Sequence, residues 1–381
     1  LLLALLLRLL PVLATRSQEI VPPWPLPMDR DGLGYASYAE NLWRGNGYVE
    51  DTGDRSHRGP GYPLLIAATF LLGGHQFLLL RVVQALLGTL ACWLLYRLAR
   101  AGWGEEAGRW AAMISAVYPP FIFYSPQVLN STLYMALVVA ALLATAWAAE
   151  GALARTLAAG AMLGSAALTA GTILGAAPAL ALWLGWRRRC LLAPLLMALG
   201  TVAVLSPWIV RNWRVHHAFV LLDTNSGGVL YLGNPNFGMW TDPGAPDALD
   251  AVKRDTDYLK LDEAGKDRLL RGLAFRWMRE HPGAFVKVWA SKFLHGWSPV
   301  PDRKRWPLVL ASLLTYGVLL ALGLAGAVRA FRQGTSLGWL LVLYLVAISM
   351  THAVFLIAQR HRVPLFDPAL VVLAAVPRRR A

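Results

Sequence analysis

The sequence predicts an all-α polytopic membrane protein with about ten transmembrane helices. Of its 381 residues, 56% are hydrophobic and 15% are charged, and the mean hydropathy is +0.46. The apolar residues form long uninterrupted runs, which are typical of membrane-spanning helices. Alternating segments of about ten residues, which would indicate an outer-membrane barrel, are absent. The lipid bilayer is therefore the first expected partner of the chain.

The net charge of +14 does not indicate a nucleic-acid partner. The basic residues cluster in short loops between apolar runs, where such residues orient membrane spans. The two cysteines, Cys92 and Cys190, lie in or beside apolar runs. They form neither a disulfide framework nor the spacing of a metal site. We therefore expect no nucleic-acid partner and no metal site built on the cysteines.

Hydropathy predicts spans at residues 1–15, 76–97, 109–125, 131–149, 153–170, 172–186, 191–210, 307–328, 336–357 and 364–377. The first run is short, contains Arg8 and is not preceded by Met. This favours a clipped start. A cleaved signal peptide is the alternative, although no small-residue cleavage site stands out.

The apolar segment Tyr62–Gly74 is too short to cross a membrane comfortably, so we expect an interfacial helix. With that choice, the arginines of the short loops share one side. These are Arg97, Arg100, Arg109, Arg155, Arg187, Arg188, Arg189, Arg329, Arg332, Arg378, Arg379 and Arg380. The positive-inside rule then places loop 16–75 and segment 211–306 outside the cytoplasm.

Three regions follow from this topology. Residues 1–210 form an N-terminal transmembrane region that includes the first outside loop, 16–75. Residues 211–306 form a larger outside loop region, and residues 307–381 return to the membrane. Within the loop region, the stretch DAVKRDTDYLKLDEAGKDRLLRGLAFRWMREHPGAF predicts an amphipathic helix that ends at its His-Pro-Gly sequence.

The first outside loop carries a second predicted helix. Asp31, Tyr35, Ala39 and Leu42 fall on one helical face, and Gly45-Asn46-Gly47 ends it. A carboxylate at the start of a helix interacts favourably with the helix dipole. From spacing alone, Asp31 is either a functional acid or the N-cap of a surface helix.

A basic turn follows, with His57, Arg58 and the sequence Pro60-Gly61-Tyr62-Pro63. A guanidinium at this depth would lie near the membrane surface, and its fork suits phosphate oxygens. The alternative is an interfacial arginine that extends toward the headgroups. The Gly- and Pro-rich turn fixes the backbone around Arg58.

The order of these motifs resembles a known family. DGLGYASYAENLWRGNGY followed by RGPGYP is similar to the first outside loop of bacterial GT-C membrane glycosyltransferases that use polyprenyl-phosphate sugars. The protein O-mannosyltransferases and the lipid A aminoarabinose transferase belong to this group. SPWIVRNWRV, LLDTNSGGVLYLGNPN and QRHRVPLFDPALVVLAA continue the resemblance, which runs from about residue 29 to the end.

The resemblance implies an inverting glycosyltransferase of the inner membrane that acts on the periplasmic side. Asp31 would be the catalytic base, and the donor phosphate would be bound by Arg58, Arg211, Arg360 and Arg362. Tyr35, His57 and Asn212 would contact substrate. The acceptor would be a lipid, a glycan or a protein. No cofactor is implied with certainty, and a divalent cation stays open.

Simpler roles stay open beside these. Arg211, Arg360 and Arg362 could be interfacial anchors, Tyr35 could only pack its helix, and Asn212 could only cap a loop. Two departures from the family keep a non-catalytic member open: Ser131 stands where relatives carry an acid, and Ala170-Gly171 stands where they show Arg-Pro. A transporter or flippase of a lipid-linked sugar is the other rival, although the predicted spans are almost free of charge at their centres.

Overall fold

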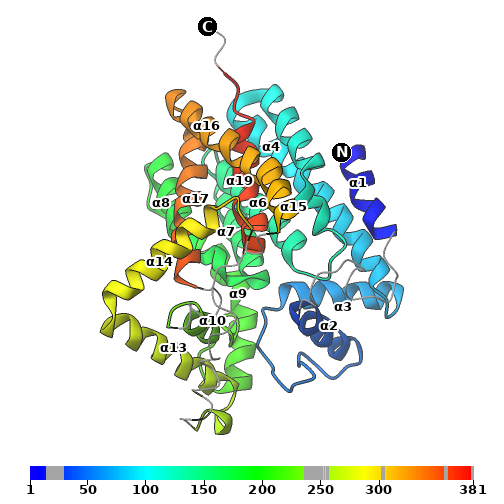
Figure 1. The fold of residues 1–381 in the computed structure, drawn as a ribbon, viewed down its shortest axis with the longest axis vertical. Coiled ribbons are helices and arrows are strands. Elements are labelled where there is room, and N and C mark those ends of the chain that lie inside the picture. Colours follow the sequence, from blue (N-terminus) through cyan, green and yellow to red (C-terminus); the bar gives the residue numbers. More distant parts are fainter. Residues whose placement is uncertain are drawn as a thin grey trace.

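The computed structural model describes residues 1–13, 30–235, 252, 254, 257–301, 305–355 and 359–378. Every regular element within these ranges is helical, which confirms the predicted all-α class (Figure 1). The predicted loop residues 16–29 and the arginines Arg379 and Arg380 lie outside the described residues.

The first half of the chain forms the following helices: α1 (Leu2–Leu13), α2 (Arg30–Trp43), α3 (Gly61–Gly73), α4 (Phe77–Val117), α5 (Pro119–Phe123), α6 (Ser131–Ala148), α7 (Leu153–Thr169), η1 (Gly171–Ala176), α8 (Ala177–Arg188) and α9 (Leu192–His216). The second half forms α10 (Ser226–Leu232), η2 (Asp257–Lys260), α13 (Glu263–Glu280), α14 (Pro282–Trp297), α15 (Trp306–Ser312), η3 (Leu313–Gly317), α16 (Val318–Arg332), α17 (Ser336–Val354), η4 (Gln359–His361), α18 (Arg362–Leu365) and α19 (Asp367–Ala374).

Five helical stretches are long and apolar enough to cross a membrane: α4, α6, α9, the continuous stretch Trp306–Arg332, and α17. Helices α1, α3 and α7 are apolar but shorter. The chain is thus a multi-pass membrane protein, although the count of ten spans is not confirmed. The span predicted at 76–97 and the first part of the span predicted at 109–125 fall within α4, where Gly104, with φ 83°, breaks the helical geometry between them. The second predicted span extends beyond Val117 into α5.

The long helices pack through small residues. Gly160 of α7 faces the backbone of α9, and the hydroxyl of Thr201 donates to the Gly160 carbonyl at 3.1 Å. Small residues let helix backbones approach closely, which is the usual packing mode within a bilayer. On the outer side of α9, Leu195, Leu199 and Val202 remain more than half exposed. Such a surface is suited to contact with lipid.

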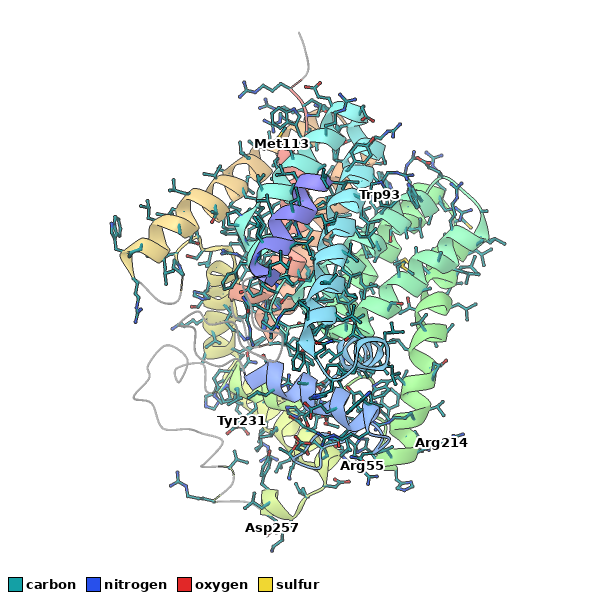
Figure 2. The ribbon with its side chains drawn as sticks, turned by 90° about the vertical axis from the view of Figure 1, so that its right-hand side faces the viewer. Arg55, Trp93, Met113, Arg214, Tyr231 and Asp257 are labelled. Atoms are coloured by element: carbon teal, nitrogen blue, oxygen red, sulfur yellow. The ribbon has the colours of Figure 1, made fainter. Side chains whose placement is uncertain are left out.

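Helices α2 and α3 lie across the direction of the long helices. Figure 1 shows α3 along its length, and Figure 2, turned by 90°, shows it end-on. Tyr62, Ile66 and Phe70 of α3 are buried against α2 and the start of α4, whereas Leu71 and Leu72 are exposed. The transverse setting agrees with the interfacial helix predicted at 62–74.

The loop region gathers at the end of the molecule where α2 lies. Helices α10 and α13 occupy that end in Figure 1, and Figure 2 places Arg55, Tyr231 and Asp257 there, far from Trp93 and Met113 of α4. The amphipathic helix predicted from the sequence is α13, and His281 separates it from α14, which begins at Pro282. Asp262 caps α13, since its Oδ1 accepts the N–H of Gly265 at 2.7 Å.

Candidate active site

Asp31 lies in the first turn of α2, as predicted from the helical spacing. The carboxylate is therefore close to the positive end of the helix dipole. The helix ends at Trp43, and the following turn has Gly45 and Gly47 at φ +82° and +83°. A residue with a side chain would be strained at such angles, so the Gly-Asn-Gly sequence explains why the chain reverses here.

The Asp31 carboxylate is held between two arginines from distant parts of the chain. Oδ1 pairs with Nη2 of Arg58 at 3.0 Å, and Oδ2 pairs with Nη2 of Arg360, which is 329 residues away. We call these three residues the Asp31 cluster. The Asp31 and Arg360 side chains are each about one-third exposed, at 33% and 32%, so the cluster is open to solvent on one side.

The pKa of Asp31 reflects this setting. Burial acts to raise the pKa, but the charges of Arg58 and Arg360 outweigh it and lower the pKa below the ordinary value. Burial acts to lower the pKa of Arg58, but the interactions with Tyr35 and then with Asp31 outweigh it and raise the pKa above the ordinary value. Both groups are thus ionised at neutral pH.

Arg58 is fixed by its surroundings. Its guanidinium lies over the Tyr35 ring, 4.7 Å from the centroid, and the Tyr48 hydroxyl donates to its carbonyl at 2.8 Å. Gly34 makes room for it, because a Cβ at Gly34 would lie 2.6 Å from Arg58 Nε. Tyr35 in turn meets Tyr62 edge-on at 5.1 Å. The structure thus brings together Asp31, Arg58, Arg360 and Tyr35 from the predicted set.

Arg211 and Asn212 lie elsewhere, around the buried hydroxyl of Ser56. Arg211 Nη1 donates to Ser56 Oγ at 2.6 Å and to the Arg55 carbonyl at 2.8 Å, and its Nη2 donates to the Tyr48 carbonyl at 3.0 Å. Ser56 donates to Asn212 Oδ1 at 3.0 Å. Because the single hydroxyl hydrogen is used there, Nε2 of His216 must be the donor in its 2.8 Å contact with Ser56. Binding of donor phosphate by Arg211 stays a prediction.

Arg362 also lies apart from Asp31. It is buried in α18, its guanidinium stacks over the Tyr316 ring at 3.4 Å, and Nη1 donates to the Ser298 carbonyl at 2.9 Å. Tyr316 belongs to η3, a π-helical turn within the stretch Trp306–Arg332. Arg360 and Arg362 are only two residues apart, yet their side chains contact different residues: Arg360 pairs with Asp31, whereas Arg362 contacts Tyr316 and Ser298. Phosphate binding by Arg362 likewise stays a prediction.

His57 stands directly before Arg58. Its backbone N–H donates to the Tyr38 hydroxyl at 3.0 Å. Burial, and then the charge of Arg58, lower the pKa of the imidazole, so the ring is favoured in its neutral form. A neutral ring beside Asp31 could accept or donate one hydrogen bond to substrate, and this role stays a prediction.

The sequence did not point to Glu263, whose carboxylate accepts backbone N–H groups of the first loop. It also did not point to Ser56, whose hydroxyl is hydrogen-bonded to Arg211, Asn212 and His216. No local signal marks either residue. Ser131, which stands where relatives carry an acid, lies buried at the start of α6. Among the residues that the structure describes, no group of three or more His, Cys, Asp or Glu could hold a metal ion.

The chain is similar to known glycosyltransferases in part of its sequence and in its fold. Residues 57–211 match the family model of dolichyl-phosphate-mannose-protein mannosyltransferase. No match was found among curated proteins. The fold is similar to the oligosaccharyltransferase AglB from Archaeoglobus fulgidus in complex with an inhibitory peptide and a dolichol-phosphate, with a TM-score of 0.59 and 17% identity. That similarity covers 98% of this chain and 49% of AglB.

Two further structures extend the comparison. An oligosaccharyltransferase from Archaeoglobus fulgidus in complex with zinc and sulfate has a TM-score of 0.53 and 15% identity, and the similarity covers 98% of this chain and 48% of that one. ArnT from Cupriavidus metallidurans bound to undecaprenyl phosphate has a TM-score of 0.43 and 16% identity, covering 98% and 76%. The chain spans about half of the length of AglB. The family match over residues 57–211 and the similarity of fold confirm the resemblance to the protein O-mannosyltransferases found in the sequence.

Proposed function

We propose that this protein is an inverting glycosyltransferase that moves a sugar from a polyprenyl-phosphate donor to an acceptor hydroxyl. The observation that carries the proposal is the Asp31 cluster, in which one carboxylate is held by two arginines that can also bind phosphate. The match to mannosyltransferases and the dolichol-phosphate bound to AglB support a lipid-linked donor.

The donor phosphate would exchange places with Asp31. When its oxygens pair with Arg58 and Arg360, the carboxylate loses the charges that lower its pKa, and burial then raises the pKa and makes Asp31 a stronger base. Asp31 accepts the proton of the acceptor hydroxyl, and the acceptor oxygen bonds to the anomeric carbon. The bond from that carbon to the phosphate oxygen breaks, and its electron pair stays on the phosphate. A single displacement inverts the anomeric carbon.

The arrangement supports a site on the periplasmic side of the inner membrane. The last turn of α16, with Arg329 and Arg332, lies at the end of the molecule opposite to α2 and α13 in Figure 1. Arginine-rich loop ends face the cytoplasm in membrane proteins. The Asp31 cluster would then face the other side, at the level of lipid headgroups.

An apolar groove is the candidate site of the polyprenyl chain. Phe285, Val286 and Trp289 of α14 and Met350, Thr351 and Val354 of α17 line a groove of about 390 Å³. This volume lies within the range of ligand sites. The groove reaches Val354, near the end of α17, and the connection that follows leads to Arg360. A chain lying in the groove would keep its phosphate on the same side of the membrane as Arg360.

The test is sugar transfer from radiolabelled polyprenyl-phosphate sugars to cell-envelope fractions, comparing the wild type with Asp31→Asn at matched expression. Loss of a general base is expected to lower transfer by about 10²- to 10⁴-fold. Glu40→Gln is the matched control, because Glu40 lies on the same helix and pairs with His75 at 2.9 Å. Equal transfer by Asp31→Asn would refute Asp31 as base. No transfer by the wild type with any donor would favour the transporter or the non-catalytic member.

A further inference from the structure

The first loop is held by a carboxylate from a distant helix. Glu263, the first residue of α13, accepts the backbone N–H of Arg55 at Oε2, at 2.7 Å, and the N–H of Ser56 at Oε1, at 2.9 Å. The Thr224 hydroxyl also donates to Oε1. Arg55 and Ser56 are each more than 200 residues from Glu263 in the sequence, whereas Thr224 is closer. Both carboxylate oxygens are used, and each accepts a hydrogen bond from the loop.

This contact reaches the Asp31 cluster through three consecutive peptide groups. The N–H groups of Arg55 and Ser56 go to Glu263, and the N–H of His57 goes to the Tyr38 hydroxyl of α2. The Ser56 carbonyl accepts the N–H of Thr224 at 2.9 Å. The next residue is Arg58. Its guanidinium can meet Asp31 only while the backbone before it stays in place.

Helix α13 is itself tied to a second segment of the loop region. Asp267 accepts the N–H of Gly227 at 2.5 Å and the hydroxyl of Ser226 at 3.3 Å, both in α10, and it pairs with Arg271. Helices α10 and α13 therefore form one unit. Glu263 and Thr224 join this unit to the first loop, and the opposite face of α13, with Phe275 and Arg276, is exposed.

The geometry points to Glu263 as a positioning residue for the Asp31 cluster: it fixes the backbone of residues 55–57 so that Arg58 meets Asp31. The residue type is required by its partners. Three donors converge on one side chain, and only a carboxylate offers two acceptor oxygens with no hydrogen of its own. A glutamine would turn an NH₂ group toward one of the loop N–H groups. The fixing of residues 55–57 by Glu263 does not depend on the proposed function. Only its effect on the rate of sugar transfer rests on that function.

Hydrogen–deuterium exchange on the full chain in detergent micelles tests the structural part. In Glu263→Gln, the amides of residues 54–62 are expected to exchange at least tenfold faster than in the wild type, because one of the Arg55 and Ser56 N–H groups loses its acceptor and faces an NH₂ group instead. Asp262→Asn is the matched control. Asp262 is the neighbouring acid and caps α13 through Gly265, and asparagine caps a helix about as well as aspartate, so exchange at residues 54–62 should stay as in the wild type.

Sugar transfer tests the kinetic part. Glu263→Gln is expected to lower kcat about tenfold or more, Asp262→Asn less than twofold, and Glu263→Asp is expected to recover part of the loss. Unchanged exchange at residues 54–62 in Glu263→Gln would overturn the proposal, as would faster exchange with unchanged kcat. If the wild type transfers no sugar, the proposed function fails, and the exchange experiment alone decides whether Glu263 holds the loop.

Discussion

Two arginine clusters flank the same short stretch of the first loop, and they differ in what their guanidiniums face. In the Asp31 cluster, Arg58 and Arg360 share one partly exposed carboxylate. Around Ser56, the guanidinium of Arg211 donates to two backbone carbonyls and a hydroxyl. Ser56 itself is fully buried.

The difference bears on which arginines are suited to bind the donor phosphate under the proposed function. Carboxylate and phosphate are both anions that pair with an arginine fork, so a donor phosphate can replace Asp31 on Arg58 and Arg360. Arg211 donates to neutral groups of the protein itself, and a phosphate that took their place would leave the Arg55 and Tyr48 carbonyls without this donor. The first cluster is therefore suited to chemistry, and the second to holding the loop that presents Arg58.

The largest effect that separates the two clusters is expected from Arg360→Ala. Loss of one preorganised cation that stabilises the leaving phosphate should lower sugar transfer by about 100-fold. The fold should change little, since Arg360 is one-third exposed. Transfer kinetics and thermal unfolding in detergent measure both quantities. Arg360→Lys keeps the charge but loses the guanidinium fork, so its transfer rate should lie between those of the wild type and Arg360→Ala. Wild-type kinetics in Arg360→Ala would remove Arg360 from the proposed site.

Arg211→Ala is expected to show the opposite pattern. The hydrogen bonds from this guanidinium to Arg55, Ser56 and Tyr48 are lost, and hydrogen bonds to charged groups contribute about 1.5–3 kcal/mol each. The melting temperature should therefore fall by several degrees, with a smaller loss of transfer than in Arg360→Ala. A variant that melts like the wild type and has lost donor binding would instead establish Arg211 as a phosphate ligand, as the sequence resemblance predicts.

The sequence could predict local features of this site because they depend on near neighbours. The helix with Asp31 in its first turn follows from the spacing of residues 31–42 and from the Gly-Asn-Gly turn. The transverse helix α3 follows from an apolar run too short to span. The helix that begins at Glu263 follows from its amphipathic pattern and its His-Pro end.

The pairing of distant residues could not be predicted in the same way. Arg211 and Arg360 both stand at predicted outer ends of spans, and no pattern distinguishes the one that reaches Asp31. The Glu263 contact depends on how α13 returns to the first loop, which only the packed structure determines. The span predictions at 76–97 and 109–125 located apolar segments but not the merged helix α4 and its break at Gly104.

A smaller effect on sugar transfer is expected from a substitution in the groove between α14 and α17, the candidate site of the donor's polyprenyl chain. Val286→Asp places a charge on the groove wall at a position that is 59% exposed, so the fold should tolerate it. Desolvating that charge should raise the KM for a long-chain donor about tenfold, or about 1.4 kcal/mol. A short-chain donor should be affected less.

Leu294→Asp is the control for the groove, because Leu294 lies on the same helix, is 69% exposed and does not line the groove. Its KM for both donors should stay near that of the wild type. Equal effects of the two substitutions on long-chain and short-chain donors would place the polyprenyl chain elsewhere.

The smallest effect is expected from pH, and it separates Asp31 from Asp223, a second partly buried acid. The pKa of Asp31 in the free protein lies below its ordinary value, so its carboxylate is ionised throughout the range from pH 6.5 to 5. Burial raises the pKa of Asp223 to about 6, so that acid takes up a proton as pH falls through the same range. Because kcat/KM reports groups of the free enzyme, a reaction that uses Asp31 should lose less than twofold in kcat/KM between pH 6.5 and 5. A loss with a midpoint near pH 6 that disappears in Asp223→Asn would instead assign the base to Asp223, and the Asp31 cluster would then serve only to hold the donor phosphate.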